Sequence, residues 1–296
     1  MEKKPSYEVA NYDNNSLTET LDAAPAPEDW IRAQDSLKTR LVLRDDFSWL
    51  LPDGQSGSEA TVLRYVCGVD VSYAKEDPTA ACGGLVVLDL ATLEVVYEDF
   101  NLVHLDVPYV PGFLAFREVP VILELLEKMK RSHNPCYPQI LMVDGNGVLH
   151  PRGFGLASHL GVLADLPSIG VGKNLHCIDG LTESGVRQLL TANAKNRGEF
   201  ISLTGQSGST LGAAMISAPG SMKPIYISTG HRMSLASAIK VVKYSCKFRV
   251  PEPIRQADIK SRAYLRKHLM DDPAPRYISI INGLQIGALT PNRPIK

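Results

Sequence analysis

The alternation of apolar and polar positions downstream of residue 60 predicts strands joined by short turns. Three apolar stretches follow one another closely enough to form an antiparallel meander, and they span residues 65–73, 81–89 and 93–105. Further along the chain, apolar runs predict a strand that ends at Asp144, another over 168–172 that leads into Lys173, and two more within 209–229. The chain is therefore expected to build a sheet from both neighbouring and distant strands.

Apolar residues at helical spacing predict five helices. Four of them cover residues 29–47, 108–131, 155–164 and 253–270. The other begins within residues 230–235, with Ser234 as its N-cap. Glu118 and Asp258 lie on the apolar faces of their helices, where a carboxylate is costly unless it is paired, protonated or bound to a cation. Pro120 removes a helix hydrogen bond and is expected to kink or restart the helix near Glu118.

The apolar run Ile140–Val143 leads directly into Asp144, and glycines follow at 145 and 147. This pattern predicts a buried strand whose last residue projects a carboxylate into a crevice, with a turn that lets the backbone approach a ligand. A strand that simply ends in an Asp-Gly turn is the common alternative, and the stretch alone favours it.

The segments outside these elements are polar. Residues 1–28 are expected to be disordered, 51–59 to form a Gly/Ser loop, 174–208 to be less regular and 271–296 to form a tail. The apolar runs fall short of the roughly 18 residues that a membrane span needs, and the N-terminus lacks an apolar signal core. Five cysteines without paired spacing indicate reduced thiols rather than a zinc site. We expect an intracellular protein.

The net charge of −1 conceals an asymmetry along the 296 residues, of which 44% are hydrophobic and 21% charged. That length can form a sizeable core in one domain or two. Residues 1–60 carry 12 acidic and 6 basic residues, whereas residues 221–268 carry 11 Lys/Arg against Glu252 and Asp258. A basic C-terminal third suits a polyanionic partner, although solvated helix faces commonly carry similar charge.

Carboxylates recur at core-facing and strand-end positions, namely at Asp70, Glu118, Asp144 and Asp258. Each alone could be a cap, a turn residue or a surface charge. Mg²⁺ prefers oxygen ligands, and carboxylates that converge on a phosphate are typical of phosphoryl-transfer sites. The four together favour a metal-dependent enzyme that acts on phosphates.

A series of motifs resembles the endonuclease V family in order and spacing. The motifs are Gly68–Tyr73, Pro108–Glu118, Val143–Arg152, Gly230–Ser234 and Pro251–Asp258, and the resemblance covers roughly residues 60–270. The sequence Asp-Gly-Asn-Gly, followed by Leu-His, resembles animal members in particular. The resemblance implies an α/β RNase H-like fold, a mixed sheet flanked by helices, in a single domain at residues 29–270 between the two tails.

The resemblance also implies roles for the acids. Asp70, Glu118 and Asp144 match the metal-binding acids of the family, and Asp258 matches the acid of its last helix. The implied cofactor is Mg²⁺, for which Mn²⁺ can substitute. The implied chemistry is hydrolysis that leaves 3′-hydroxyl and 5′-phosphate ends.

Two further residues match catalytic positions of the family. His150 matches a histidine near the reacting phosphate, a water-positioning or proton-transfer group, and its alternative is a buried histidine held by backbone. Lys173 matches a lysine that holds the attacking water or the developing charge. Asn174 follows it where relatives often have a second lysine, which puts backbone binding there in doubt.

Other residues match the part of the family that recognises the base. Tyr109 matches a wedge that is inserted beside the lesion while the base turns out. The implied base pocket is formed by Gly112, Leu114, Gly145 and Leu156. Its donors and acceptors would distinguish hypoxanthine from adenine. We expect Asp144 and Gly145 to face one cavity, so that a single turn joins chemistry to recognition.

The leading interpretation is an Mg²⁺-dependent endoribonuclease that recognises inosine in single-stranded RNA and cuts the second phosphodiester 3′ to it. The alternatives are a DNA-repair nuclease for deoxyinosine and an inosine-RNA binding module that has lost cleavage. The residues themselves do not separate ribose from deoxyribose. The resemblance further implies a monomer without membrane association, located in the cytoplasm and also in the nucleolus.

Overall fold

The computed structural model describes residues 9–10, 26–52, 61–193, 199–218, 221, 223–271 and 278–280. The expectations for the N-terminal 28 residues, the Gly/Ser loop and the C-terminal tail fall largely outside the described residues. Within the described part, no helix has both the length and the apolar character needed to cross a membrane.

A ten-stranded mixed sheet forms the centre of the described chain. Its order is β10-β4-β3-β2-β5-β6-β9-β8-β7, and β1 pairs with β2 outside this path. The strands are β1 (Val9–Ala10), β2 (Tyr65–Ala74), β3 (Ala80–Asp89), β4 (Val95–Leu105), β5 (Ile140–Asp144), β6 (Ser168–Gly172), β7 (Phe200–Thr204), β8 (Thr210–Met215), β9 (Ile225–His231) and β10 (Ile278–Ile280). The predicted meander β2-β3-β4 is confirmed, whereas β5 pairs in parallel with both β2 and β6.

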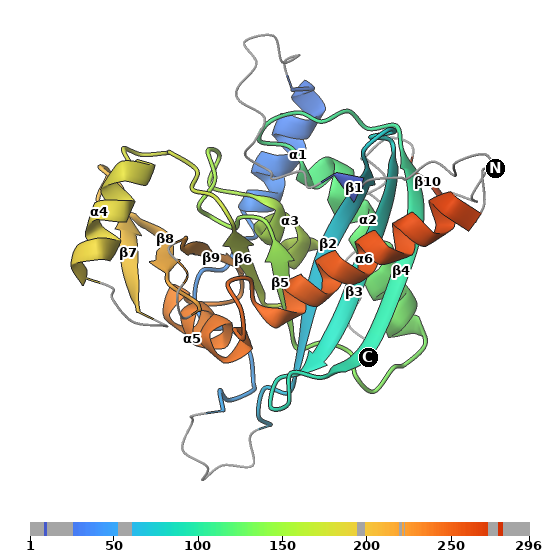
Figure 1. Cartoon of the computed structure of the whole chain (residues 1–296). Helices are drawn as coiled ribbons and strands as arrows, with labels where there is room; N and C mark the ends of the chain where they lie inside the picture. Colours follow the sequence, from blue (N-terminus) through green and yellow to red (C-terminus); the bar gives the residue numbers. More distant parts are fainter. Residues whose placement is uncertain are drawn as a thin grey trace, which may run out of the picture.

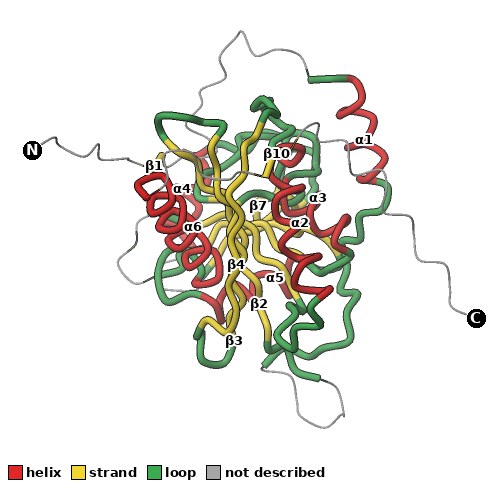
Figure 2. The backbone as a smooth tube through the Cα atoms, turned by 90° about the vertical axis from the view of Figure 1, so that its right-hand side faces the viewer, coloured by secondary structure: helices red, strands yellow, loops and turns green. Residues whose placement is uncertain are grey.

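Helices cover both faces of this sheet. They are α1 (Glu28–Lys38), α2 (Ala115–Arg131), α3 (Leu156–Ala164), α4 (Glu183–Asn193), α5 (Leu235–Ser245) and α6 (Glu252–Asp271). In Figure 1, α6 crosses β2, β3 and β4, and Figure 2 places α2 and α3 on the opposite side of the strands. The predicted N-cap of α5 is confirmed, because the Ser234 hydroxyl accepts a hydrogen bond of 3.2 Å from Ser237 N.

The apolar core lies in two layers because alternate residues of the central strands point to opposite faces. In β2, Cys67 and Val69 pack with the apolar residues of α2 and α3, whereas Val66 packs with those of α5 and α6. Both faces are therefore covered, which explains why apolar residues on this strand point to both sides. At Gly68 the contact is so close that a Cβ atom would lie 1.9 Å from the carbonyl oxygen of Pro253, at the start of α6.

The first helix is shorter than predicted. It ends at Lys38 rather than at Phe47. The chain beyond it pairs with the end of β9, where Arg232 N donates to Val42 O (2.7 Å) and Val42 N donates to the ring of His231 (3.3 Å). These distant hydrogen bonds replace the local ones that a longer helix would form.

Of the two effects expected of Pro120, a restart of the helix does not occur: α2 continues through it to Arg131, because the buried side chains after it hold the helix against the sheet. One further prediction needs correction. The region 174–208, predicted as less regular, contains α4 and β7. Their apolar signal is short, because α4 buries only Val186 and Leu190 and the alternation of buried and exposed positions in β7 covers five residues.

Candidate active site

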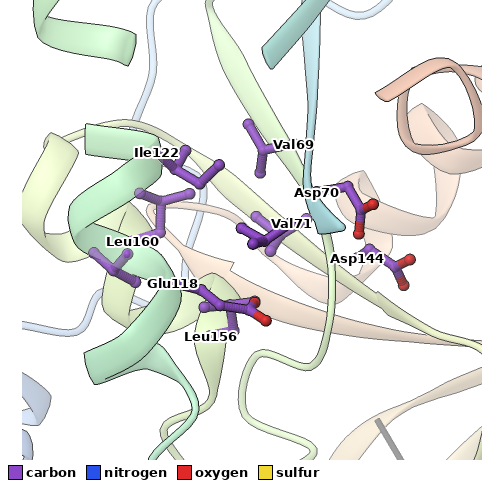
Figure 3. Close-up of a pocket in the computed structure, with 10 residues that line it drawn as sticks. Val69, Asp70, Val71, Glu118, Ile122, Asp144, Leu156 and Leu160 are labelled. Carbon is purple, nitrogen blue, oxygen red and sulfur yellow. The ribbon is translucent and has the colours of Figure 1, made fainter. Parts of the chain in front are cut away.

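Three of the predicted acids line one cavity of about 240 Å³, counted with its opening to solvent. Asp70 and Asp144 meet there because β2 and β5 are parallel neighbours, with Val69 opposite Val143 in the register. Glu118 enters from the first turn of α2, on the other side of the cavity (Figure 3). We call this the acidic cavity.

Burial strongly favours the neutral form of two of these carboxyl groups. Burial first, and the neighbouring Asp144 second, raise the pKa of Asp70 to about 7. Burial also raises the pKa of Glu118 to about 8, with the charge of Asp70 adding to it, although a hydrogen bond from Tyr73 Oη to Glu118 Oε1 (2.8 Å) acts in the opposite direction. The acidic cavity therefore has too little positive charge to compensate its carboxylates.

Lys173 supplies a cation at this site. Its Nζ lies 2.6 Å from Asp144 Oδ2, and its position after β6 follows from the parallel pairing of β5 and β6. In the arrangement described, no three His, Cys, Asp or Glu side chains among the described residues converge closely enough to hold a metal ion. Asp70, Glu118 and Asp144 thus share a cavity, but they do not form a ready-made three-ligand site.

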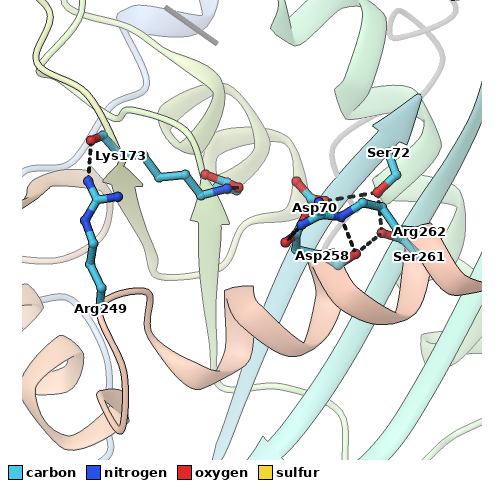
Figure 4. A network of polar contacts seen from close by, with 8 residues as sticks. Asp70, Ser72, Lys173, Arg249, Asp258, Ser261 and Arg262 are labelled. Carbon is cyan, nitrogen blue, oxygen red and sulfur yellow. Dashed lines mark hydrogen bonds and ion pairs between the residues drawn. The ribbon is translucent and has the colours of Figure 1, made fainter. Parts of the chain in front are cut away.

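Asp258 lies beside the acidic cavity rather than in its lining. Its carboxylate pairs with Arg262, one turn further along α6 (Figure 4). Arg262 contributes a positive charge that lowers the pKa of Asp70. The hydroxyl of Ser72 also links β2 to α6, through a contact of 2.7 Å with Ser261 Oγ. Asp258 is therefore connected to the acidic cavity indirectly, because it pairs with Arg262, whose charge acts on Asp70.

A second cavity of about 490 Å³, counted with its opening, lies beside the first. Its lining includes the predicted residues Tyr109, Gly112, Leu114, Gly145, His150 and Leu156. Gly112 has a φ of 80° and Gly145 a φ of 155°, values that favour glycine over other residues. We call this the base cavity, after the residues of the implied base pocket that line it.

Asp144 and Gly145 do not face one cavity, so that expectation is wrong. Asp144 lines the acidic cavity and Gly145 lines the base cavity. The chain changes direction between them, where Gly145 N donates to Val171 O (3.2 Å). Leu156 lines both cavities and forms their common wall. The turn at Asp144 and Gly145 therefore connects two adjoining cavities instead of contributing both residues to one.

His150 lines the base cavity and not the acidic one. Burial lowers its pKa to about 4, with the nearby His176 as the next cause, so the ring is neutral at physiological pH. Its Nδ1 accepts a hydrogen bond from Arg152 N (3.2 Å), which assigns the ring proton to Nε2. The ring centroid of His176 lies 5.9 Å away.

Gln34 and His176 are polar residues of the base cavity that the sequence did not predict. A signal for Gln34 was present, since it follows Trp30 by four residues and so shares the buried face of α1. His176 offered no comparable signal, because its approach to His150 depends on how two distant loops pack.

A mixed sheet flanked by helices, with carboxylates from two central strands and a covering helix gathered in one cavity, defines an α/β protein of the RNase H-like class. The family model described as Endonuclease V matches residues 53–259. Endonuclease V of Homo sapiens is 48% identical over 263 residues, 86% of this chain and 92% of that protein. The chain belongs to the Endonuclease V family and is an endonuclease.

Solved structures agree with this assignment. The catalytic domain of human Endonuclease V matches with a TM-score of 0.77 at 48% identity, over 83% of this chain and 99% of that one. Ciona intestinalis Endonuclease V, in complex with DNA containing an inosine followed by a ribo-adenosine, matches with a TM-score of 0.73 at 36% identity, over 81% of this chain and 97% of that one. The fold prediction is confirmed.

Proposed function

We propose that this endonuclease recognises inosine in single-stranded RNA and hydrolyses the second phosphodiester 3′ to it, with Mg²⁺ as cofactor. The observation that carries the proposal is the contact between the two cavities. One cavity gathers carboxylates, the other is lined by glycine backbone and by half-buried Tyr109 and His150, and Leu156 separates them. A base held in one cavity would place a nearby phosphate beside the other.

The acidic cavity suits a divalent cation by its donor chemistry. Asp70, Glu118 and Asp144 would hold the ion, because hard cations select carboxylate oxygens. The raised pKa values of Asp70 and Glu118 are a further argument, since negative charge there lacks compensation. A bound divalent cation would polarise the phosphate and lower the pKa of a water molecule. Mn²⁺ would be accepted as well, because it prefers the same ligands.

The chain's own groups would position the substrate. The Lys173 ammonium, beside Asp144, would stabilise negative charge that develops at the phosphate. The neutral His150 ring would donate from Nε2 towards the nucleotide in the base cavity. Tyr109, on the wall of the same cavity, would occupy the space beside the turned-out base.

The base cavity would select hypoxanthine through its backbone. Gly112 and Gly145 leave main-chain groups accessible to a flat purine. Hypoxanthine presents O6 and a protonated N1, whereas adenine presents an amino group and an unprotonated N1. Adenine would therefore leave buried polar groups unpaired, which is a strong source of discrimination.

Deoxyinosine in DNA is the second candidate substrate. The Ciona protein was crystallised with inosine-containing DNA in which a ribo-adenosine follows the inosine. The 48% identity to the human protein supports the animal-type resemblance on which the preference for RNA rests.

The test compares matched single-stranded oligonucleotides that contain one ribo-inosine, one deoxyinosine or one adenosine at the same place, each with Mg²⁺ and with excess chelator. We expect cleavage in the order ribo-inosine, then deoxyinosine, and none for adenosine or without metal. Equal cleavage of the adenosine control would overturn base recognition. Faster cleavage of the deoxyinosine strand than of the ribo-inosine strand would favour the repair nuclease instead.

A further inference from the structure

The helix α1 closes the base cavity, although it precedes the family match at residues 53–259. Its Gln34 is 1% exposed and lines the cavity. The side-chain Nε2 donates to Gly112 O and to Phe154 O, each at 3.1 Å. These carbonyls belong to two loops that approach the cavity from different parts of the chain, so one amide group joins its two walls.

The other end of the same amide is also engaged. Arg152 Nε donates to Gln34 Oε1, and the Arg152 guanidinium pairs with Asp35 at 2.7 Å. One turn further along α1, Lys38 Nζ donates to Arg152 O at 2.7 Å. Arg152 N is in turn the donor to the His150 ring. The loop that carries His150 is thus fastened to α1 at several points.

The helix is itself held against α2. Trp30, 7% exposed, stacks on Phe116 with ring centroids 4.9 Å apart and an interplanar angle of 3°. Phe113 lies in the same cluster, at 6.3 Å from the Trp30 ring. Phe116 is two residues before Glu118, so α1 takes its position from the helix that supplies an acid to the neighbouring cavity.

We propose that Gln34 is a positioning residue that sets the separation of the two walls of the base cavity and so determines how closely they fit a flat purine. The proposal rests on the proposed function, because it concerns recognition of the base. Glutamine suits this position, since its amide nitrogen supplies two donors for two carbonyls while its oxygen accepts from Arg152. Carbonyl groups that lose their donor away from solvent are left unpaired at a free-energy cost, so the walls would rearrange if the amide were removed.

The test measures KM and kcat for ribo-inosine and adenosine oligonucleotides with Gln34→Met, which keeps the side-chain volume, and with Gln34→Glu, which keeps the acceptor for Arg152 and loses both donors. We expect both variants to raise KM for ribo-inosine about tenfold, which corresponds to a loss of about 1.4 kcal/mol of binding free energy. The kcat of both variants should stay within about twofold of wild type. Discrimination against adenosine should fall by a similar factor. The matched control is Arg32→Ala on the exposed face of α1, where the ion pairs are local, and it should change neither constant.

A purely structural role would lower the melting temperature of the Gln34 variants but leave KM and discrimination at wild-type values, and this result would overturn the proposal. If Gln34→Met and Gln34→Glu do not fold, the double variant Asp35→Asn/Lys38→Met tests the proposal instead, because both residues are exposed and both contact Arg152. It should raise KM about threefold, and an unchanged KM would overturn the proposal. Failure of the proposed function is seen separately, in a wild-type enzyme that does not distinguish inosine from adenosine.

Discussion

At the scale of single residues, Asp70 is a partly buried carboxylate with a second carboxylate, Asp144, as its neighbour. Its pKa is raised to about 7, chiefly by burial and then by Asp144, so ionisation in the absence of a cation is costly. We infer that the charge is kept for chemistry rather than for stability, because a buried carboxylate without a full complement of partners destabilises the folded state.

Asp70→Asn should therefore lower kcat by about 10³-fold or more, since an oxygen ligand with charge is lost. Affinity for inosine RNA should stay within about threefold, because the base cavity is unchanged. Single-turnover cleavage and fluorescence anisotropy measure the two quantities. The exposed Asp106→Asn is the control, and Mg²⁺-dependent cleavage by Asp70→Asn at the wild-type rate would refute the assignment.

His159, in α3, shows the effect of burial on a base. It is fully buried between Phe116 and Phe154, and neither ring nitrogen has a hydrogen-bond partner among the described residues. Burial lowers its pKa from 6.5 to about 3. Below about pH 6.5 the unfolded chain therefore binds a proton at this histidine, whereas the folded chain does not. As a result, the free energy of unfolding decreases as the pH falls from 6.5 towards 3.

His159→Leu should remove this dependence. The free energy of unfolding of the variant, relative to wild type, should increase as the pH falls below 6.5, by up to about 1.4 kcal/mol per pH unit. Urea denaturation between about pH 7 and pH 4.5 measures this difference. The exposed His133→Asn should leave the slope unchanged, because asparagine tolerates the positive φ of this position. A pH-independent difference between His159→Leu and wild type would contradict the account.

At the scale of secondary-structure elements, the site depends on how closely α6 approaches β2. The approach requires Gly68, where a Cβ atom would lie 1.9 Å from Pro253 O. The strand carries Asp70 and the helix carries Asp258 and Arg262, so the same contact sets the position of charges on two elements.

Gly68→Ala should force α6 away from β2 and lower the free energy of unfolding by more than about 2 kcal/mol. Cleavage should fall as well, because Arg262 would no longer face Asp70. Chemical denaturation and cleavage at saturating substrate test this, with Ala263→Ser on the exposed side of α6 as the matched control. If Gly68→Ala has the same free energy of unfolding as wild type, the contact between Gly68 and Pro253 is not tight.

The strands and helices around the site follow from local patterns in the sequence. The run that ends at Asp144 and the N-cap Ser234 were predicted correctly because neighbouring residues determine both features. The early end of α1 and the role of Gln34 depend on partners more than 70 residues away, such as Gly112. Local periodicity carries no information on such contacts. The separation of Asp144 and Gly145 into two cavities likewise depends on Leu156, which belongs to the following helix.

At the scale of the whole molecule, the basic C-terminal third is partly neutralised within the protein itself. Arg255 pairs with Glu252 at 2.9 Å, Lys260 with Glu98 at 2.6 Å, and Arg249 donates to Lys173 O at 2.7 Å. Counting lysines and arginines therefore overestimates the charge that is available to phosphates. The fold uses part of this charge to position the ends of α6 and β6.

The central claim is that two adjoining cavities couple base recognition to hydrolysis through the turn at Asp144 and Gly145. Because this turn is fixed between β5 and α3, the distance from the base to the cut should be constant.

The most direct measurement maps the cut at nucleotide resolution in RNA strands that carry one ribo-inosine in different sequence contexts, with Mg²⁺ present. The account predicts a single cut at the second phosphodiester 3′ to inosine in every context, leaving a 3′-hydroxyl. Cuts at varying distances from inosine, or the same cuts when adenosine replaces it, would contradict the account.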